Sequence, residues 1–223
     1  MIRSKEDYLA YVQADRIALG VEGRLSEWLF DDVWRFQRRL RKTEYLVNTH
    51  RGWLRRKWAT WRYMSLGRTL GFSIPINTFG PGLSIAHRGT IVVNSKARIG
   101  ANCRLHVCVN IGESTEPGST PVLGDNCYIA PGVKIFGRIV IGHDTALGAN
   151  AVVNKNFPEG HVTLAGAPAR VVNRRGSTGM HTHGYPRPFS TLTHPPSAAR
   201  KTPSPTRVRG EPVLHREGSS QAG

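Results

Sequence analysis

The sequence predicts a mainly β protein, built around a parallel β-helix with an α-helical region before it and a disordered tail after it. Three observations support this fold class. An apolar residue recurs at every sixth position between Val93 and Val153, apolar residues before position 70 follow helical spacing, and the chain loses its periodicity after position 173. These changes divide the chain into segments 1–70, 71–172 and 173–223.

The N-terminal segment, residues 1–70, carries apolar side chains at helical spacing, for example Leu25, Leu29, Val33 and Phe36. Glycines near position 20 and again at position 52 interrupt the pattern, so two or three helices are expected. The basic run 34–42 would suit a membrane surface, but the solvated side of a packed helix is the preferred interpretation.

The middle segment, residues 71–172, contains the six-residue ladder. Stepping by six from position 93 gives a branched aliphatic residue at ten of eleven positions: Val93, Ile99, Leu105, Ile111, Leu123, Ile129, Ile135, Ile141, Leu147 and Val153. This period fits neither a helix nor an isolated strand, so it predicts a short strand and a corner that repeat. Three repeats close one triangular coil, and stacked coils pair their backbones at about 4.8 Å.

The one exception in the ladder is Pro117, within the run 113–121. This run has lost the aliphatic residues while keeping the count of six. We therefore expect it to leave the prism as an external loop.

The last segment, residues 173–223, is rich in Pro, Ser, Thr, Gly, His and Arg, which predicts a disordered basic tail. Histidines of this tail, such as His181 and His183, would have no fold to fix them around a metal ion. No metal site is expected there.

Charge and cysteines exclude several classes of protein. The net charge of +16 is concentrated outside the middle: Lys and Arg outnumber Asp and Glu by 15 to 8 in residues 1–70, 8 to 5 in 71–172 and 8 to 2 in 173–223. No recognition helix or RNA motif accompanies the basic segments, so sequence-specific nucleic-acid binding is not expected. Cys103, Cys108 and Cys127 have neither disulfide nor zinc spacing, which favours buried, reduced thiols. The sequence shows neither a secretory signal nor a membrane-spanning stretch, which predicts a cytoplasmic protein.

Three stretches carry a resemblance to a known family: the run 87–93, which begins His87-Arg88-Gly89; the repeats through 141–153; and the ending Ala165-Gly166-Ala167-Pro168-Ala169-Arg170. Residues 71–172 resemble the hexapeptide-repeat acyltransferases, in particular the serine acetyltransferase-like branch. The resemblance implies a left-handed β-helix and a homotrimer with acetyl-CoA between neighbouring prisms, and it leaves a dimer of trimers open. It also implies an O-acetyltransferase that acts on L-serine or on a sugar hydroxyl, without a metal.

The resemblance assigns His87 as the general base, a role that suits histidine because its pKa lies near neutrality. His106 follows nineteen residues later, so it should lie one coil along at the same edge. With Asn77 and Arg88 it is a candidate for binding the acceptor substrate. The candidates for binding acetyl-CoA are Gly112, Ala130, Gly148, Ala149, Lys155 and Arg170.

Three departures from the serine enzymes leave the acceptor open. Phe72 stands where those enzymes orient the catalytic histidine with an Asp, Ala86 stands where they place a serine-binding Asp, and Ser119-Thr120 replace an Arg-His pair. A backbone carbonyl or Asn77 would then have to orient His87.

Two other classes compete with an acetyltransferase. A non-catalytic β-helix trimer that binds anionic partners through its basic segments would have no use for His87. A protein like the γ-carbonic anhydrases needs three zinc-binding histidines with a close pair, and no such pair accompanies His106.

Overall fold

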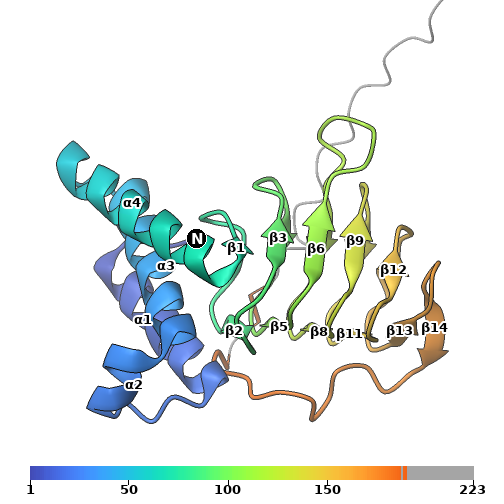
Figure 1. Cartoon of the computed structure of the whole chain (residues 1–223). Helices are drawn as coiled ribbons and strands as arrows, with labels where there is room; N and C mark the ends of the chain where they lie inside the picture. Colours follow the sequence, from blue (N-terminus) through green and yellow to red (C-terminus); the bar gives the residue numbers. More distant parts are fainter. Residues whose placement is uncertain (187, 190–223) are drawn as a thin grey trace, which may run out of the picture. The chain divides into compact units, whose positions relative to one another are not determined.

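The computed structural model describes residues 1–186, 188 and 189, so residues 190–223 of the predicted tail lie outside the described residues. Four helices come first (Figure 1): α1 Lys5–Leu19, α2 Leu25–Phe30, α3 Asp32–Asn48 and α4 Trp53–Leu70. They cover the predicted helical segment, which was expected to hold two or three helices. The additional break falls at Asp31, whose side chain accepts a hydrogen bond from the Trp34 N–H and so caps α3.

Helix ends follow the local sequence. Ser4 and Asp7 form a reciprocal capping box at the start of α1, and Gly20 ends that helix in the left-handed conformation, with φ of 74°. Gly71 ends α4 in the same way, with φ of 80°, and so turns the chain directly into the first strand.

Fourteen short strands follow in the described residues: β1 Phe72–Ser73, β2 Ser84–Ile85, β3 Ile91–Val93, β4 Arg98–Ile99, β5 Arg104–Leu105, β6 Val109–Gly112, β7 Val122–Leu123, β8 Tyr128–Ile129, β9 Lys134–Phe136, β10 Val140–Ile141, β11 Ala146–Leu147, β12 Val152–Val153, β13 Thr163–Ala165 and β14 Arg170–Asn173. They form three sheets, in the orders β1-β3-β6-β9-β12 (sheet A), β10-β7-β4 (sheet B) and β14-β13-β11-β8-β5-β2 (sheet C). Every pair is parallel except β13 with β14. The chain visits the sheets in the repeating order A, B, C, which is the predicted triangular coil.

The aliphatic ladder forms the core of the prism, as predicted. Ile111, Leu123, Ile129, Ile135 and the other ladder positions are at most 3% exposed. The register stacks them directly, with Ile111 beside Ile135 in sheet A and Leu105 beside Ile129 in sheet C. The run 113–121 leaves the prism between β6 and β7, as expected, and is the loop at the upper edge of β6 in Figure 1.

Corners of the prism need backbone conformations that few side chains adopt. Asn102, Asn126 and Asp144 occupy one corner in successive coils with φ between 53° and 59°, a region that Asn and Asp tolerate. Their side chains form a ladder, because Asn102 donates to Asn126 and Asn126 donates to Asp144, each at 2.9 Å. At Gly100 a Cβ would lie 2.2 Å from the Asp125 carboxylate, so only glycine fits there.

A buried polar network joins the helices to the first coils. Arg41 is fully buried and donates to Asp15 (2.8 and 3.2 Å) and to Glu44 (3.0 Å). It also donates to the carbonyl oxygens of Phe79 (3.0 Å) and Gly80 (2.6 Å). The basic face of α3 was expected to be solvated, and Arg41 departs from that expectation.

The segment of residues 174–186, 188 and 189 corrects the predicted tail boundary at 173. It runs from β14 back along the β-helix toward the helices (Figure 1). Ser177 donates from its N–H to the Asp144 carbonyl at 3.0 Å, and Tyr185 donates from its N–H to the Asn102 side chain at 2.9 Å. Phe189 donates from its N–H to the Asp125 carboxylate at 2.8 Å. The stacked corner residues offer polar groups that a polar, irregular segment can bind, and this fixes it without apolar burial.

Candidate functional site

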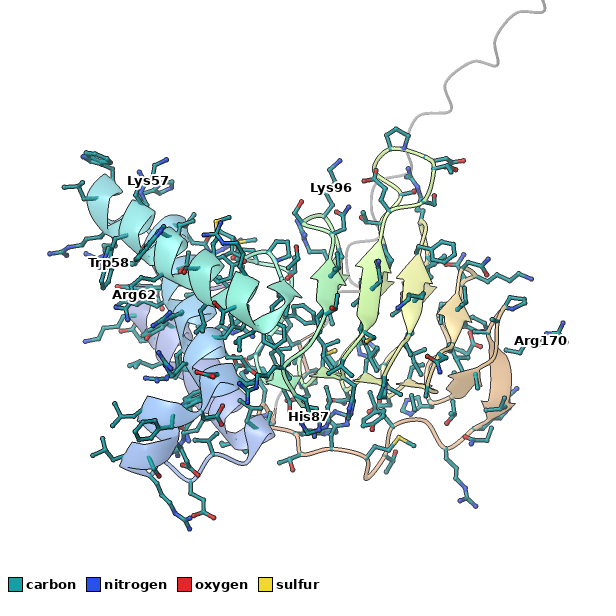
Figure 2. The ribbon with its side chains drawn as sticks, viewed as in Figure 1. Lys57, Trp58, Arg62, His87, Lys96 and Arg170 are labelled. Atoms are coloured by element: carbon teal, nitrogen blue, oxygen red, sulfur yellow. The ribbon has the colours of Figure 1, made fainter. Side chains whose placement is uncertain are left out.

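His87 lies at the edge where the chain passes from sheet C to sheet A, here called the C–A edge, between β2 and β3. Its side chain is exposed. Figure 2 shows it at the lower edge of the β-helix, opposite Lys96 at the upper edge. The neighbouring Arg88 reaches Asp32 at the start of α3, at 3.7 Å. Arg88 therefore contacts the helical region in this chain.

Buried polar side chains of the helices hold the strand that precedes His87. Asp15 accepts hydrogen bonds from the N–H groups of Gly82 and Leu83, both at 2.9 Å. Gln37 donates to the Leu83 carbonyl at 2.7 Å and accepts from the Ile85 N–H at 3.1 Å. These contacts fix β2 from the helical side and so position His87 two residues later.

His106 lies beside His87 on the next coil, as the nineteen-residue spacing predicted. The Ala86 N–H donates to the Leu105 carbonyl at 2.8 Å, and the two histidine rings have centroids 6.5 Å apart. Nε2 of His106 is buried and has no hydrogen-bond partner among the described residues. Burial, together with the charges of Arg104 and His87, lowers the pKa of His106. The lowered pKa favours the neutral imidazole of His106, whose ring lies beside that of His87.

The row of rings continues beyond His106. Its ring lies 5.1 Å from that of Tyr128, which lies 6.2 Å from that of His181, and His183 follows at 4.8 Å. His181 is held by a 2.7 Å hydrogen bond to the Asn102 carbonyl. Sequence reasoning left His181 and His183 in a disordered tail, and the structure brings both to the outer face of sheet C. Among the residues described, no group of His, Cys, Asp or Glu side chains converges as a metal site.

Asn77 is not in a position to orient His87. Its amide oxygen accepts from Asn48 at 2.8 Å and its amide nitrogen donates to Asn48 at 3.0 Å. Its backbone N–H donates to Glu44 at 2.7 Å. This reciprocal pair uses both polar atoms of the side chain, so the prediction of Asn77 as an orienting partner is wrong. In the described residues no side chain hydrogen-bonds the His87 ring.

The candidate residues for acetyl-CoA lie at two different edges. Ala130 and Gly148 occupy the position of His106 on the next two coils, because their N–H groups donate to the Leu147 and Leu164 carbonyls as that of His106 does to Ile129. Ala149 follows at the same C–A edge, which therefore has a row of small residues running away from the two histidines.

The others lie elsewhere. Gly112 ends β6 at the edge between sheets A and B, the A–B edge, and Lys155 lines a cavity of about 540 Å³ beside the external loop at that edge. Arg170 starts β14 at the far end of the prism and is exposed (Figure 2). A single chain does not bring these six residues together.

The residues that replace the orienting Asp and the Arg-His pair of the serine enzymes are engaged in the fold. Phe72 is buried against Phe36, with ring centroids 5.0 Å apart. Ser119 is buried and bonds Ser114 within the external loop, and Thr120 donates to the Lys96 carbonyl at 3.3 Å. None of these side chains offers a charge to an amino-acid substrate.

Comparison with known proteins agrees with the fold. No family model matches the chain. It is 35% identical over 104 residues to the serine acetyltransferase of Bacillus pumilus, which covers 46% of this chain and 48% of the relative. It is 33% identical over 102 residues to that of Mycobacterium tuberculosis, and this match covers 45% of this chain and 44% of the relative. The chain thus spans about half the length of the curated relatives it matches.

Solved structures match over a longer stretch. Soybean serine acetyltransferase without ligands gives a TM-score of 0.64 at 25% identity, covering 75% of this chain and 70% of that one. A serine acetyltransferase in complex with CoA gives a TM-score of 0.58 at 26% identity, covering 75% of this chain and 68% of that one.

The stacked six-residue repeats make this chain a hexapeptide-repeat protein with a left-handed parallel β-helix. In sequence and fold it is similar to the serine acetyltransferases.

Proposed function

We propose that this chain is an O-acetyltransferase that moves an acetyl group from acetyl-CoA to a hydroxyl, with His87 as the general base. The observation that carries the proposal is the C–A edge, where His87 and His106 lie side by side and continue into a row of small residues. The similarity to named serine acetyltransferases supports acetyl-CoA as the donor.

In the proposed mechanism a ring nitrogen of His87 takes the proton of the acceptor hydroxyl as its oxygen attacks the thioester carbonyl. The C–S bond then breaks, and the imidazolium returns the proton to the leaving CoA thiolate. His87 is exposed, and its ring has no hydrogen-bond partner in the part of the chain that the structure describes, so it is free to meet both substrates. His106 and Arg88 remain the proposed contacts for the acceptor.

We further propose that the active form is a homotrimer in the cytoplasm. The candidate residues for acetyl-CoA are divided between the C–A edge and the A–B edge, and these edges are separated by the width of sheet A. A three-fold arrangement that sets the C–A edge of one copy against the A–B edge of the next would unite them. Lys155 and the external loop of one copy would then complete the site of its neighbour.

For the acceptor we propose a sugar hydroxyl or L-serine, and the environments of Ser119 and Thr120 favour the sugar. The side chains at these positions are committed to the fold and carry no charge. Binding of a zwitterionic amino acid needs such charges.

An acceptor panel tests the proposal. Wild-type protein and the His87→Ala variant are incubated with acetyl-CoA and either L-serine or sugars of several classes, and loss of thioester absorbance is followed. Transfer with at least one acceptor, lost in the variant, is expected. No transfer to any hydroxyl, or equal rates in both proteins, contradicts the proposal and favours a non-catalytic trimer.

A further inference from the structure

A second site lies in the helical region, away from His87 (Figure 2). A cavity of about 480 Å³ opens between the four helices, here called the cationic cavity. Its lining residues are Tyr8, Leu29, Arg35, Arg38, Arg39, Lys42, Thr43, Trp58, Ala59 and Arg62. Five of these ten are Lys or Arg, and none is Asp or Glu. A cavity of this size holds a small-molecule group, and its charge selects an anion.

The cations of the cavity are close enough to repel one another. Arg35, Arg38, Arg39 and Lys42 follow the spacing i, i+3, i+4 and i+7 on one side of α3. Burial, together with the charges of Arg62, Arg35 and Arg38, lowers the pKa of Arg39. An anion in the cavity would relieve this repulsion.

Aromatic rings support the same cations. The Arg62 guanidinium lies 4.5 Å from the centre of the Trp58 ring, and the Lys42 ammonium lies 5.2 Å from that of Tyr8. Such contacts hold a cation in place without neutralising it. The positive charges of Arg62 and Lys42 therefore remain available to a ligand.

Next to the cavity, α4 exposes large apolar side chains. Leu54, Trp58 and Trp61 lie at i, i+4 and i+7, and Trp53 and Met64 fall on the same side of the helix. Their exposed fractions range from 49% to 65%. Leu29 of α2 is exposed at 43% and borders the cavity beside Trp58. A helix that packs one side on α3 and shows three tryptophans on another has a second apolar face to cover.

The charge of the helical region discriminates among the molecules that could cover this apolar face. From Asp32 to Leu70 the chain carries eleven Lys or Arg and two acidic residues, Asp32 and Glu44. A second copy would bring an equally positive surface against it. A polyanionic nucleic acid would use the cations and stack on the indoles, but it would leave Leu29, Leu54 and Met64 without a role.

We propose that this surface, formed by α2, α3 and α4, binds an anionic phospholipid membrane. The indoles and aliphatic side chains enter the interface between headgroups and acyl chains, and the cationic cavity receives a lipid phosphate. In the described part of the chain no helix is long and apolar enough to cross a bilayer. The attachment is therefore peripheral, and it is independent of the proposed acetyl transfer.

Vesicle co-sedimentation of the full chain tests this. Vesicles of phosphatidylcholine are compared with vesicles that also contain phosphatidylglycerol, at low and high salt. Binding to the anionic vesicles that weakens with salt is expected. Equal binding to both kinds of vesicle, or to neither, overturns the proposal.

Two test pairs of substitutions and one matched control pair identify which side chains contact the membrane. Lys57 is an exposed residue of α4. Lys57→Gln with Arg62→Gln should weaken partitioning about thirtyfold, because two basic side chains near an anionic surface are lost. Lys96→Gln with Arg175→Gln removes the same charge from exposed positions on the β-helix and on the segment that follows it, and should change partitioning by less than about twofold, because salt screens distant charges.

The apolar face has its own variant, Trp53→Ala with Trp61→Ala, which should lose roughly tenfold in partitioning. Far-UV circular dichroism and thermal unfolding check that each variant is folded. An equal loss in the control pair, or no loss in either test pair, contradicts the assigned surface.

Further experiments distinguish a membrane from the other possible ligands. Soluble glycerol phosphate and a single-stranded RNA are titrated into the protein by calorimetry. Tight binding of either one through Arg62, without vesicle binding, replaces the membrane by that ligand. Self-association that the Trp53 and Trp61 substitutions abolish, again without vesicle binding, assigns the face to a second copy of the chain.

Discussion

Replacement of Arg41 by Met should destabilise the protein strongly. The guanidinium is fully buried, pairs with Asp15 and Glu44, and donates to two backbone carbonyls at the start of the β-helix. Burial opposes its charge, but the two carboxylates raise the pKa of Arg41, so it is charged at every working pH. The substitution leaves both carboxylates buried without their cation.

The expected loss is about 3–5 kcal/mol, the usual result of removing one partner of a buried ion pair. Asp15 and Glu44 keep the backbone N–H groups of Gly82, Leu83 and Asn77 as donors, which limits the loss to this range. Urea unfolding followed by circular dichroism at fixed protein concentration measures it, because association would also contribute to stability.

Arg35→Met is the matched control on the same helix. Arg35 pairs with Asp32 at 2.8 Å, but both side chains are about one-third exposed, so the loss should be no more than about 1 kcal/mol. If Arg41→Met unfolds at the same urea concentration as Arg35→Met, the buried network is not what joins the helices to the β-helix.

Three further predictions concern thiols, pH and the core. Cys108 is exposed, whereas burial raises the pKa of Cys127 to about 12 and that of Cys103 well above its usual value. An Ellman titration should therefore find one reactive thiol in the native chain and three in denaturant. Three reactive thiols in the native chain would contradict this. An NMR titration should give His106 a pKa below about 6.5, its usual value. Because His106 then binds a proton more readily in the unfolded chain than in the folded one, its contribution to stability is lost as the pH falls below about 6.5. A raised pKa would refute the described burial. Ile129→Ala, in the middle of the ladder, should cost about 2–5 kcal/mol by urea unfolding, and a loss below about 1 kcal/mol would mean that the prism is not closely packed there.

The β-helix was predictable because its signal is local and repeated. Each ladder residue, such as Ile111 or Ile135, carries the same information about the period, so one lost step at Pro117 does not obscure it. The same count placed His106 beside His87, since one coil sets the spacing between neighbours at an edge.

Features that depend on distant partners could not be predicted. Arg41 looks like one more surface cation until Asp15 and Glu44 are placed around it. From the sequence, the segment 174–186 looks disordered because its partners, such as Asn102, expose their polar groups only when the coils stack. Cys108 was expected to be buried, but it occupies a corner with φ of 60° and is exposed.

The candidate site was predictable in part for the same reason. The resemblance assigned His87 and made Ala130 and Gly148 candidates for binding acetyl-CoA, and the structure places these two at the edge of His87. The pairing of Asn77 with Asn48 joins residues 29 positions apart on a helix end and a turn, and no local pattern indicates it.

The most direct test of the account is the kcat/KM of His87→Ala with the acceptor found in the panel. A loss of at least about a hundredfold is expected, the contribution of a general base. His161→Asn is the control, because His161 is exposed with φ of 51°, which Asn tolerates, and it should keep wild-type activity. A His87→Ala enzyme as active as the His161→Asn enzyme would contradict the role of His87.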